Sequence, residues 1–114
     1  MESELDLRRL TELQELLGSD VSEIVATLVR EISAATEAIE SSLAEGDLAA
    51  AALAAHAARN SALMLDARPM LDALREIEAG ARDEDLAAAR SGLGHLQAVW
   101  PALRSRLEAE AERA

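Results

Sequence analysis

Leucine, isoleucine, valine and alanine recur every three or four residues along nearly the whole chain. This spacing is typical of helices with one buried face, because successive residues of a helix turn by about 100°. The chain contains no sustained alternation of apolar and polar residues and no Asn-Gly or Asp-Gly turn that would indicate paired strands. The pattern therefore predicts an all-α protein.

Five helical segments are separated by short stretches that carry helix-ending residues. They are a short helix over 4–17, a second from 21 to about 45, a third from 48 to about 66, a fourth from 69 to 79 and a last one from about 83. Asp20 and Glu23 resemble a capping box at the start of the second helix. Asp47 can cap the third helix, and Pro69 suits the first turn of the fourth. The fourth helix is expected to end before Gly80.

The second and last helices carry the longest apolar stripes. The stripe of the second consists of Val21, Ile24, Leu28, Ile32, Ala35, Ile39 and Leu43, and that of the last of Leu86, Ala89, Leu93, Leu96, Trp100, Leu103 and Leu107. Trp100 is the one aromatic residue, and its place in the stripe favours a core anchor over an exposed contact. Pro101 cannot bond to the carbonyl of Gln97, so we predict a kink or a break there.

Short connections between these amphipathic helices favour antiparallel neighbours. We therefore predict an antiparallel up-and-down four-helix bundle with an additional short N-terminal helix across one end. A chain of 114 residues has the length of one domain, so residues 1–114 are expected to form a single unit.

Acidic residues outnumber basic ones by 22 to 11, which gives a net charge of −11. Such a charge repels nucleic acid and anionic membranes. The absence of cysteine excludes disulfides, thiolate zinc sites and thiol nucleophiles. The first residues lack the apolar run of a signal peptide, and no stretch reaches the roughly 18 apolar residues of a membrane helix. We therefore expect a soluble cytoplasmic protein.

The third helix, within the segment "LAAAALAAHAARNSALMLDA", is almost entirely apolar except for four polar residues, His56, Arg59, Asn60 and Ser61. Residues three and four apart share a helix face, so His56 lies beside Arg59 and Asn60. A separate stripe suited to the core consists of Ala51, Ala55, Ala58, Ala62 and Leu65. This separation predicts an exposed histidine, because the polar residues and the core stripe lie on different sides of the helix.

The surroundings of His56 differ from the other exposed faces, which carry Glu, Asp and Arg. Its face is lined by Ala49, Ala52, Leu53 and Leu63. A small apolar surface around a titratable residue is typical of a docking site. On composition alone, a docking site and an ordinary solvated histidine remain equally supported.

The chemistry open to this histidine is phosphoryl transfer. An imidazole is largely neutral at pH 7, and its nitrogen can accept a phosphoryl group as a labile phosphoramidate. The guanidinium of Arg59, one turn away, can stabilise the charge on the phosphoryl oxygens. A nucleophile and a nearby cation are most of what this reaction needs from a protein.

The sequence lacks the motifs of two other kinds of site, a di-metal centre and a hydrolase. A di-metal site in a bundle needs Glu three residues before a histidine, but Leu53 and Gly92 precede His56 and His95. A Ser-His-acid hydrolase needs a nucleophile elbow and an oxyanion loop, and the sequence shows neither. We expect His95 to be a surface residue.

The third helix resembles the phosphoacceptor helix of histidine-containing phosphotransfer (HPt) domains of multistep two-component signalling. The family pattern is Ala-His, then Lys or Arg three residues after the histidine, Gly at four, a small residue at five, and a closing Leu-Gly-Ala. The matching residues here are Ala55, His56, Arg59, Ser61, Leu65 and Ala67. The resemblance covers roughly residues 5–108 and departs from the pattern at Asn60 and Asp66, where the family has glycine.

The resemblance implies that His56 is the phosphoacceptor and that Arg59 is the basic residue near the phosphoryl group. It implies a monomeric signalling intermediate whose partners are response-regulator receiver domains or a hybrid sensor histidine kinase. The chain would need no cofactor of its own, because Mg²⁺ belongs to the acidic pocket of the receiver. Without an ATP-binding motif, it is not expected to phosphorylate itself.

Asn60 keeps an alternative open. Its side chain can hydrogen-bond a phosphoryl oxygen or crowd the partner, so the chain could instead be a non-phosphorylated HPt-like bundle that binds a receiver or a sensor kinase. The phosphotransfer hairpin of sensor kinases is a related possibility, which Arg59 and Asn60 suit. Ala57 and Ser61 do not suit it, because they replace the acidic residue and the proline of that motif.

Overall fold

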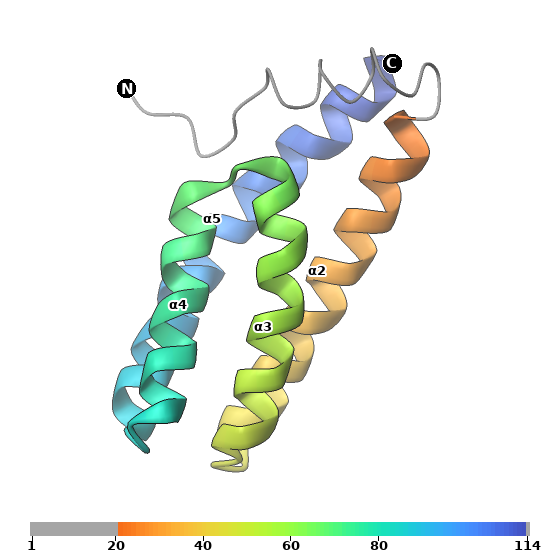
Figure 1. The fold of residues 1–114 in the computed structure, drawn as a ribbon. Coiled ribbons are helices and arrows are strands. Elements are labelled where there is room, and N and C mark those ends of the chain that lie inside the picture. The colour runs from red at the N-terminus through yellow and green to blue at the C-terminus, as the bar shows by residue number, and fades with distance from the viewer. Residues whose placement is uncertain (1–20, 114) are drawn as a thin grey trace.

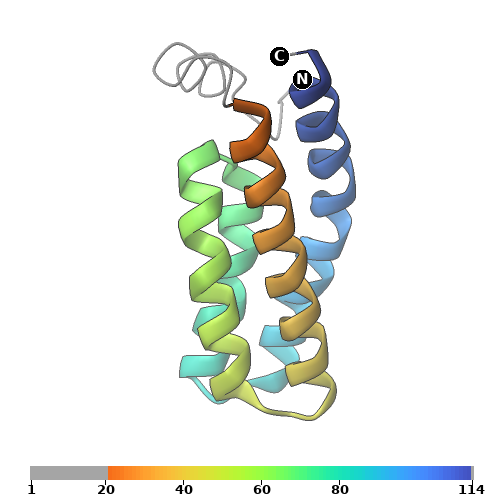
Figure 2. The same cartoon turned by 90° about the vertical axis from the view of Figure 1, so that its right-hand side faces the viewer.

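Four long helices form an antiparallel bundle in a computed structural model that describes residues 21–113. The helices are α2 (Val21–Ala44), α3 (Leu48–Leu65), α4 (Arg68–Arg82) and α5 (Leu86–Arg113). Consecutive helices run in opposite directions, and α5 closes the ring by packing against α2 (Figures 1 and 2). The predicted all-α, up-and-down bundle is confirmed. The short helix predicted over 4–17 and the cap at Asp20 lie outside the described residues.

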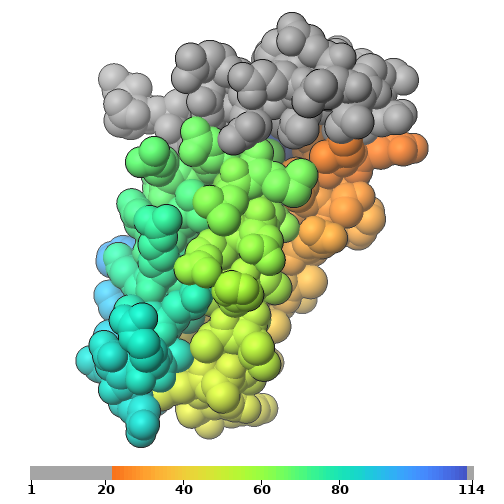
Figure 3. Space-filling view, viewed as in Figure 1, coloured from red at the N-terminus to blue at the C-terminus, as the bar shows by residue number. Residues whose placement is uncertain are grey.

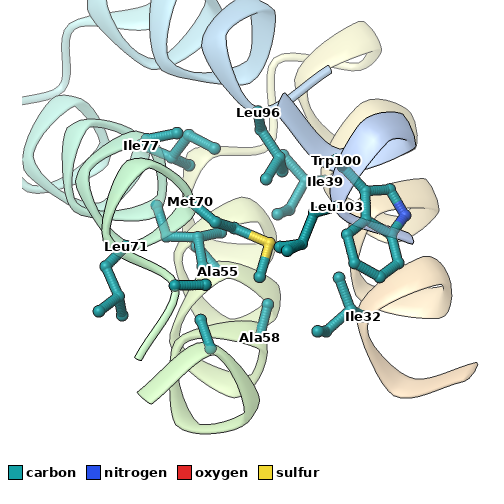
Figure 4. Packing of buried hydrophobic residues seen from close by; sticks show 14 of the residues in the cluster. Ile32, Ile39, Ala55, Ala58, Met70, Leu71, Ile77, Leu96, Trp100 and Leu103 are labelled. Atoms are coloured by element: carbon teal, nitrogen blue, oxygen red, sulfur yellow. The ribbon is translucent and has the colours of Figure 1, made fainter. Parts of the chain in front are cut away.

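The core runs along the bundle axis and receives side chains from all four helices (Figure 4). Its largest fully buried members are Val25, Ile32, Ile39, Leu43, Leu65, Met70, Leu74, Ile77, Leu96, Leu103 and Leu107. Trp100 is only 6% exposed, so its prediction as a core anchor is confirmed. Within residues 21–113, no helix combines the length and the apolar character needed to cross a membrane.

Both ends of α3 follow the sequence prediction. Gly46 takes a left-handed φ of 74° in the turn before the helix, and the Asp47 side chain accepts a hydrogen bond of 3.1 Å from the N–H of Ala50. Asp66 closes the helix with a φ of 53°, and its N–H donates to the carbonyl of Ala62. This left-handed closure is the position at which glycine is ordinarily favoured. Aspartate, like asparagine, adopts the left-handed conformation more readily than most other residues. Asp66 can therefore take the place of glycine at this position.

The predicted end of α4 before Gly80 is wrong, and its start is shifted by one residue. The helix begins at Arg68, with Pro69 in its first turn, and continues through Gly80 to Arg82. Gly80 is buried against α5, and a Cβ atom there would lie 2.6 Å from the backbone nitrogen of Ala89. This glycine therefore permits a close helix approach and does not end the helix.

The last helix also departs from the prediction. It begins at Leu86, because Asp85 caps it by accepting a hydrogen bond of 3.0 Å from the N–H of Ala88. The break predicted at Pro101 does not occur, since α5 continues to Arg113. Pro101 is exposed, so its ring is accommodated on the outer side of the helix.

The two mid-helix glycines Gly80 and Gly94 should respond oppositely to alanine. Gly80→Ala is expected to lower the free energy of unfolding by about 1–3 kcal/mol, because the new methyl group overlaps the α5 backbone. Gly94→Ala is the matched control, because nothing lies within 4 Å of the position that its new methyl group would take. It should raise the free energy of unfolding by about 1 kcal/mol through helix propensity. Urea denaturation measures both, and two equal effects would contradict the close approach of α4 and α5.

Candidate functional site

The outward face of α3 lies in the middle of one face of the molecule, between α2 and α4 (Figure 3). The inward stripe predicted from the sequence is buried, since Ala51, Ala55, Ala58, Ala62 and Leu65 are each at most 2% exposed. The His56 side chain, by contrast, is 59% exposed. The predicted separation of a buried stripe from an exposed histidine is therefore confirmed.

Two charged side chains, Arg59 and Glu78, lie on one side of the His56 ring. The Nη2 atom of Arg59 lies 3.2 Å from His56 Nδ1, as expected for residues three apart on a helix. Glu78, which belongs to α4, places its Oε1 atom 3.8 Å from the same nitrogen. The Oε2 atom of Glu78 lies 3.3 Å from Arg59 Nη1. Two helices thus bring a cation and a carboxylate to Nδ1.

The contact between Arg59 and Glu78 is a partly buried ion pair that joins α3 to α4. Both side chains are partly buried, with 30% of Arg59 and 22% of Glu78 exposed. The Oε2 atom of Glu78 is buried, yet it has no hydrogen-bond partner in the part of the chain that the structure describes. Arg59 is therefore the charge that compensates a partly buried carboxylate, through an ion pair without hydrogen-bond geometry.

Arg59 and Glu78 favour opposite protonation patterns of the ring. A guanidinium can only donate, so its contact with Nδ1 requires a lone pair there and places the proton of a neutral ring on Nε2. Glu78 lies 3.8 Å from Nδ1, too far for a hydrogen bond, but its negative charge favours a proton on Nδ1 and leaves the lone pair on Nε2. An electrophile approaching from solvent meets a nucleophilic Nε2 only in the second case. Glu78 is therefore the group that can make the exposed nitrogen reactive.

The remaining polar residues of α3 occupy different positions. Asn60 is exposed and shares the outward face with His56. Ser61 is only 6% exposed, and its hydroxyl donates a hydrogen bond of 3.3 Å to Glu31 Oε1 of α2. Ser61 therefore belongs to the contact between α2 and α3 and lies away from the imidazole.

The apolar surface predicted around His56 lies on the outside of the bundle. Leu53 is 75% exposed and Leu63 is 49% exposed. Ala49 is also exposed, and Ala52 is half-buried. Met64, which the sequence reasoning did not include, adds a further side chain at 47% exposure. Large exposed side chains of this kind are what a docking surface requires.

The second histidine has different surroundings. His95 is exposed on α5, as predicted, and its Nδ1 lies 2.7 Å from Glu76 Oε1 of α4. Glu76 and Glu78 are thus two residues apart on one helix and serve different histidines. Over residues 21–113, no three His, Cys, Asp or Glu side chains gather closely enough to hold a metal ion.

The sequence matches no protein-family model and no curated protein. The structure is similar to the crystal structure of histidine-containing phosphotransfer protein B (HptB) from Pseudomonas aeruginosa PAO1, with a TM-score of 0.92 and 22% sequence identity. The superposition covers 100% of this chain and 99% of that chain. The chain therefore has the fold of a histidine-containing phosphotransfer protein, as the sequence resemblance implied.

The opposing preferences of Arg59 and Glu78 can be measured directly. In Glu78→Ala, a neutral His56 ring should carry its proton on Nε2 in a larger fraction of molecules, because Arg59 then contacts Nδ1 without a competing negative charge. Long-range ¹H–¹⁵N NMR spectra of the imidazole report this fraction. Glu76→Ala is the matched control and should alter His95 alone. An unchanged His56 spectrum in Glu78→Ala would contradict the assignment.

Proposed function

We propose that this protein is a phosphorelay intermediate in which His56 takes a phosphoryl group from a receiver-domain aspartate and passes it to another receiver aspartate. The observation that carries the proposal is the exposed imidazole, with Arg59 and Glu78 at its Nδ1 atom and an apolar face around it. The fold of a histidine-containing phosphotransfer protein supports the same role.

The transfer balances without any further reactant. The lone pair of Nε2 attacks the phosphorus of the aspartyl phosphate, the N–P bond forms, and the P–O bond to aspartate breaks. The aspartate leaves as a carboxylate with the electron pair, and the proton on Nδ1 stays on the ring. Transfer to the second receiver reverses these events, with its aspartate carboxylate as the nucleophile.

Arg59 and Glu78 divide the charges of this reaction between them. The negative Glu78 stabilises the ring, which gains positive charge as the N–P bond forms. In this mechanism Arg59 turns from Nδ1 toward the incoming phosphoryl oxygens, where its guanidinium stabilises their charge. We place the Mg²⁺ of the reaction in the receiver and none in this chain.

The partner surface in this proposal is the apolar face around His56. Leu53 and Leu63 flank the imidazole along the helix. The small side chains of Ala49 and Ala52 leave the imidazole accessible to a partner. A receiver that buries Leu53 and Leu63 brings its aspartyl phosphate to Nε2 and excludes water from the N–P bond. Since both receivers would use this face, they bind one at a time.

His56→Ala should abolish phosphoryl transfer, because it removes the imidazole that acts as the nucleophile. The measurement is incubation of the full chain with each phosphorylated receiver encoded in the same genome, followed by detection of acid-labile label on the chain. His95→Ala is the matched control, since His95 is also exposed and paired with a glutamate, and it should be labelled like the unaltered protein. Label that survives in His56→Ala would contradict the proposal.

The same assay decides the alternative of a non-phosphorylated binding module. That alternative requires that no receiver labels the unaltered chain, while a receiver or sensor kinase binds the chain and His56→Ala equally well. Phosphorylation of the unaltered chain by any one receiver would exclude it.

Removing the Asn60 side chain should speed transfer several-fold, because it opens space beside the imidazole. Two variants separate this effect from stability. Asn60→Gly restores the family pattern but costs helix stability of up to about 1 kcal/mol, whereas Asn60→Ala removes the side chain and favours the helix. Single-turnover transfer rates should rise in both. Slower transfer in both would show that Asn60 assists the phosphoryl group.

A further inference from the structure

Three arginines form a row along α4, beside the face that carries His56. Arg68, Arg75 and Arg82 are seven residues apart, so each step turns the direction of the side chain by only about 20°. Their side chains are exposed to 80%, 59% and 74%. We refer to these three residues as the arginine row.

The arginine row borders the candidate site directly. Glu78, which contacts His56 and Arg59, follows Arg75 by three residues and precedes Arg82 by four. Residues at these spacings are surface neighbours on a helix. Two members of the row therefore stand one turn on either side of the carboxylate that reaches the imidazole.

Two of the three acidic residues of α4, Asp72 and Glu76, lie on its other flank. Asp72 and Glu78 are on opposite sides of Arg75, because they lie three residues before and three residues after it. Glu76 turns toward α5, where it binds His95. Apart from Glu78, which is engaged at the site, the acidic groups of α4 thus face away from α3.

Each arginine of the row has an aspartate as a long-range, exposed ion-pair partner. The distances from the guanidinium nitrogens to aspartate oxygens are 3.8 Å for Arg68, 3.9 Å for Arg75 and 3.6 Å for Arg82. Exposed ion pairs of this length contribute little to stability. The guanidinium groups can therefore exchange these aspartates for carboxylates of a partner.

The opposite flank of the His56 face is acidic. Glu23 and Glu31 of α2 line a groove that Met64 of α3 closes, and Glu31 also accepts the hydrogen bond from Ser61. Helix α3 itself contains no acidic residue. Across this face the surface therefore changes from acidic on α2, through apolar on α3, to exposed guanidinium groups that are weakly paired with aspartates on α4.

We propose that the arginine row binds an acidic patch of the receiver beside its phosphorylated aspartate, and thereby fixes how the receiver is turned on the His56 face. This inference rests on the proposed function. The apolar face of α3 allows a partner to dock at any rotation about the imidazole. Exposed guanidinium groups on the α4 flank, and glutamates on the α2 flank, favour the one rotation that brings partner carboxylates to α4. A protein partner fits better than a polyanion, since the net charge of −11 repels nucleic acid and anionic lipid.

Charge reversal on α4 tests this orientation. Arg75→Glu/Arg82→Glu should weaken receiver binding by about tenfold, raise KM for phosphoryl transfer by a similar factor and change kcat far less. It should also reduce the dependence of binding on salt. The matched control is Arg30→Glu/Arg104→Glu, which changes the net charge equally on a groove between α2 and α5. The control should alter binding by no more than about twofold. Thermal melting confirms that both variants are folded.

The outcomes separate this inference from the proposed function. If the unaltered chain is phosphorylated and both double variants weaken binding equally, or neither does, the orientation by the arginine row is wrong and the role of His56 stands. If no receiver phosphorylates the unaltered chain, but one binds it and only the α4 reversal weakens that binding, the proposed function is wrong and the docking role of the row stands.

Discussion

The rotation of α3 about its own axis determines where every polar side chain of the site points. Ala51, Ala55, Ala58 and Ala62 let α3 approach its neighbours closely, and Leu65 anchors the end of the same stripe in the core. Turning the helix by one residue would expose Leu65 and drive larger side chains into a space shaped for methyl groups, which a close-packed interior does not tolerate. The outward position of His56 therefore follows from the packing of residues that never touch it.

The same packing brings α4 to the imidazole. Gly80 and Gly92 allow α4 and α5 to lie close together, since a Cβ atom at Gly92 would be 2.9 Å from the backbone nitrogen of Ile77. Helix α4 is thus held from behind by α5 while Glu78 reaches across to His56 and Arg59. A nucleophile and cation on one helix and a carboxylate on the next form a site whose parts are positioned by two rigid elements. The ion pair between Arg59 and Glu78 joins the two helices beside the imidazole.

The sequence predicted the parts of this structure that depend on one helix at a time. The buried and exposed faces of α3, its cap at Asp47 and its end at Asp66 all follow from local spacing and turn chemistry. Glu78 was not predicted, because its approach to His56 depends on how two helices are placed side by side. A search for polar residues that border the apolar stripe of α4 would have found Glu78 as a candidate.

The wrong predictions have the same origin. A glycine can end a helix or let another helix approach, and only the presence of Ala89 opposite Gly80 decides between these roles. In α2, Ile24 is half-buried while Thr36 is buried. Thr36 can be buried because its hydroxyl donates a hydrogen bond of 2.8 Å to the Ile32 carbonyl. A stripe drawn from apolar residues alone misses a threonine of this kind.

The central claim is that the Nε2 atom of His56 is the acceptor, because the groups of α3 and α4 occupy the Nδ1 side of the ring. The most direct measurement is a long-range ¹H–¹⁵N NMR spectrum, with ³¹P detection, of the chain after transfer from a phosphorylated receiver. We expect a phosphoryl group on Nε2 of His56 and an unmodified His95. A phosphoryl group on Nδ1 of His56, or on His95, would contradict it.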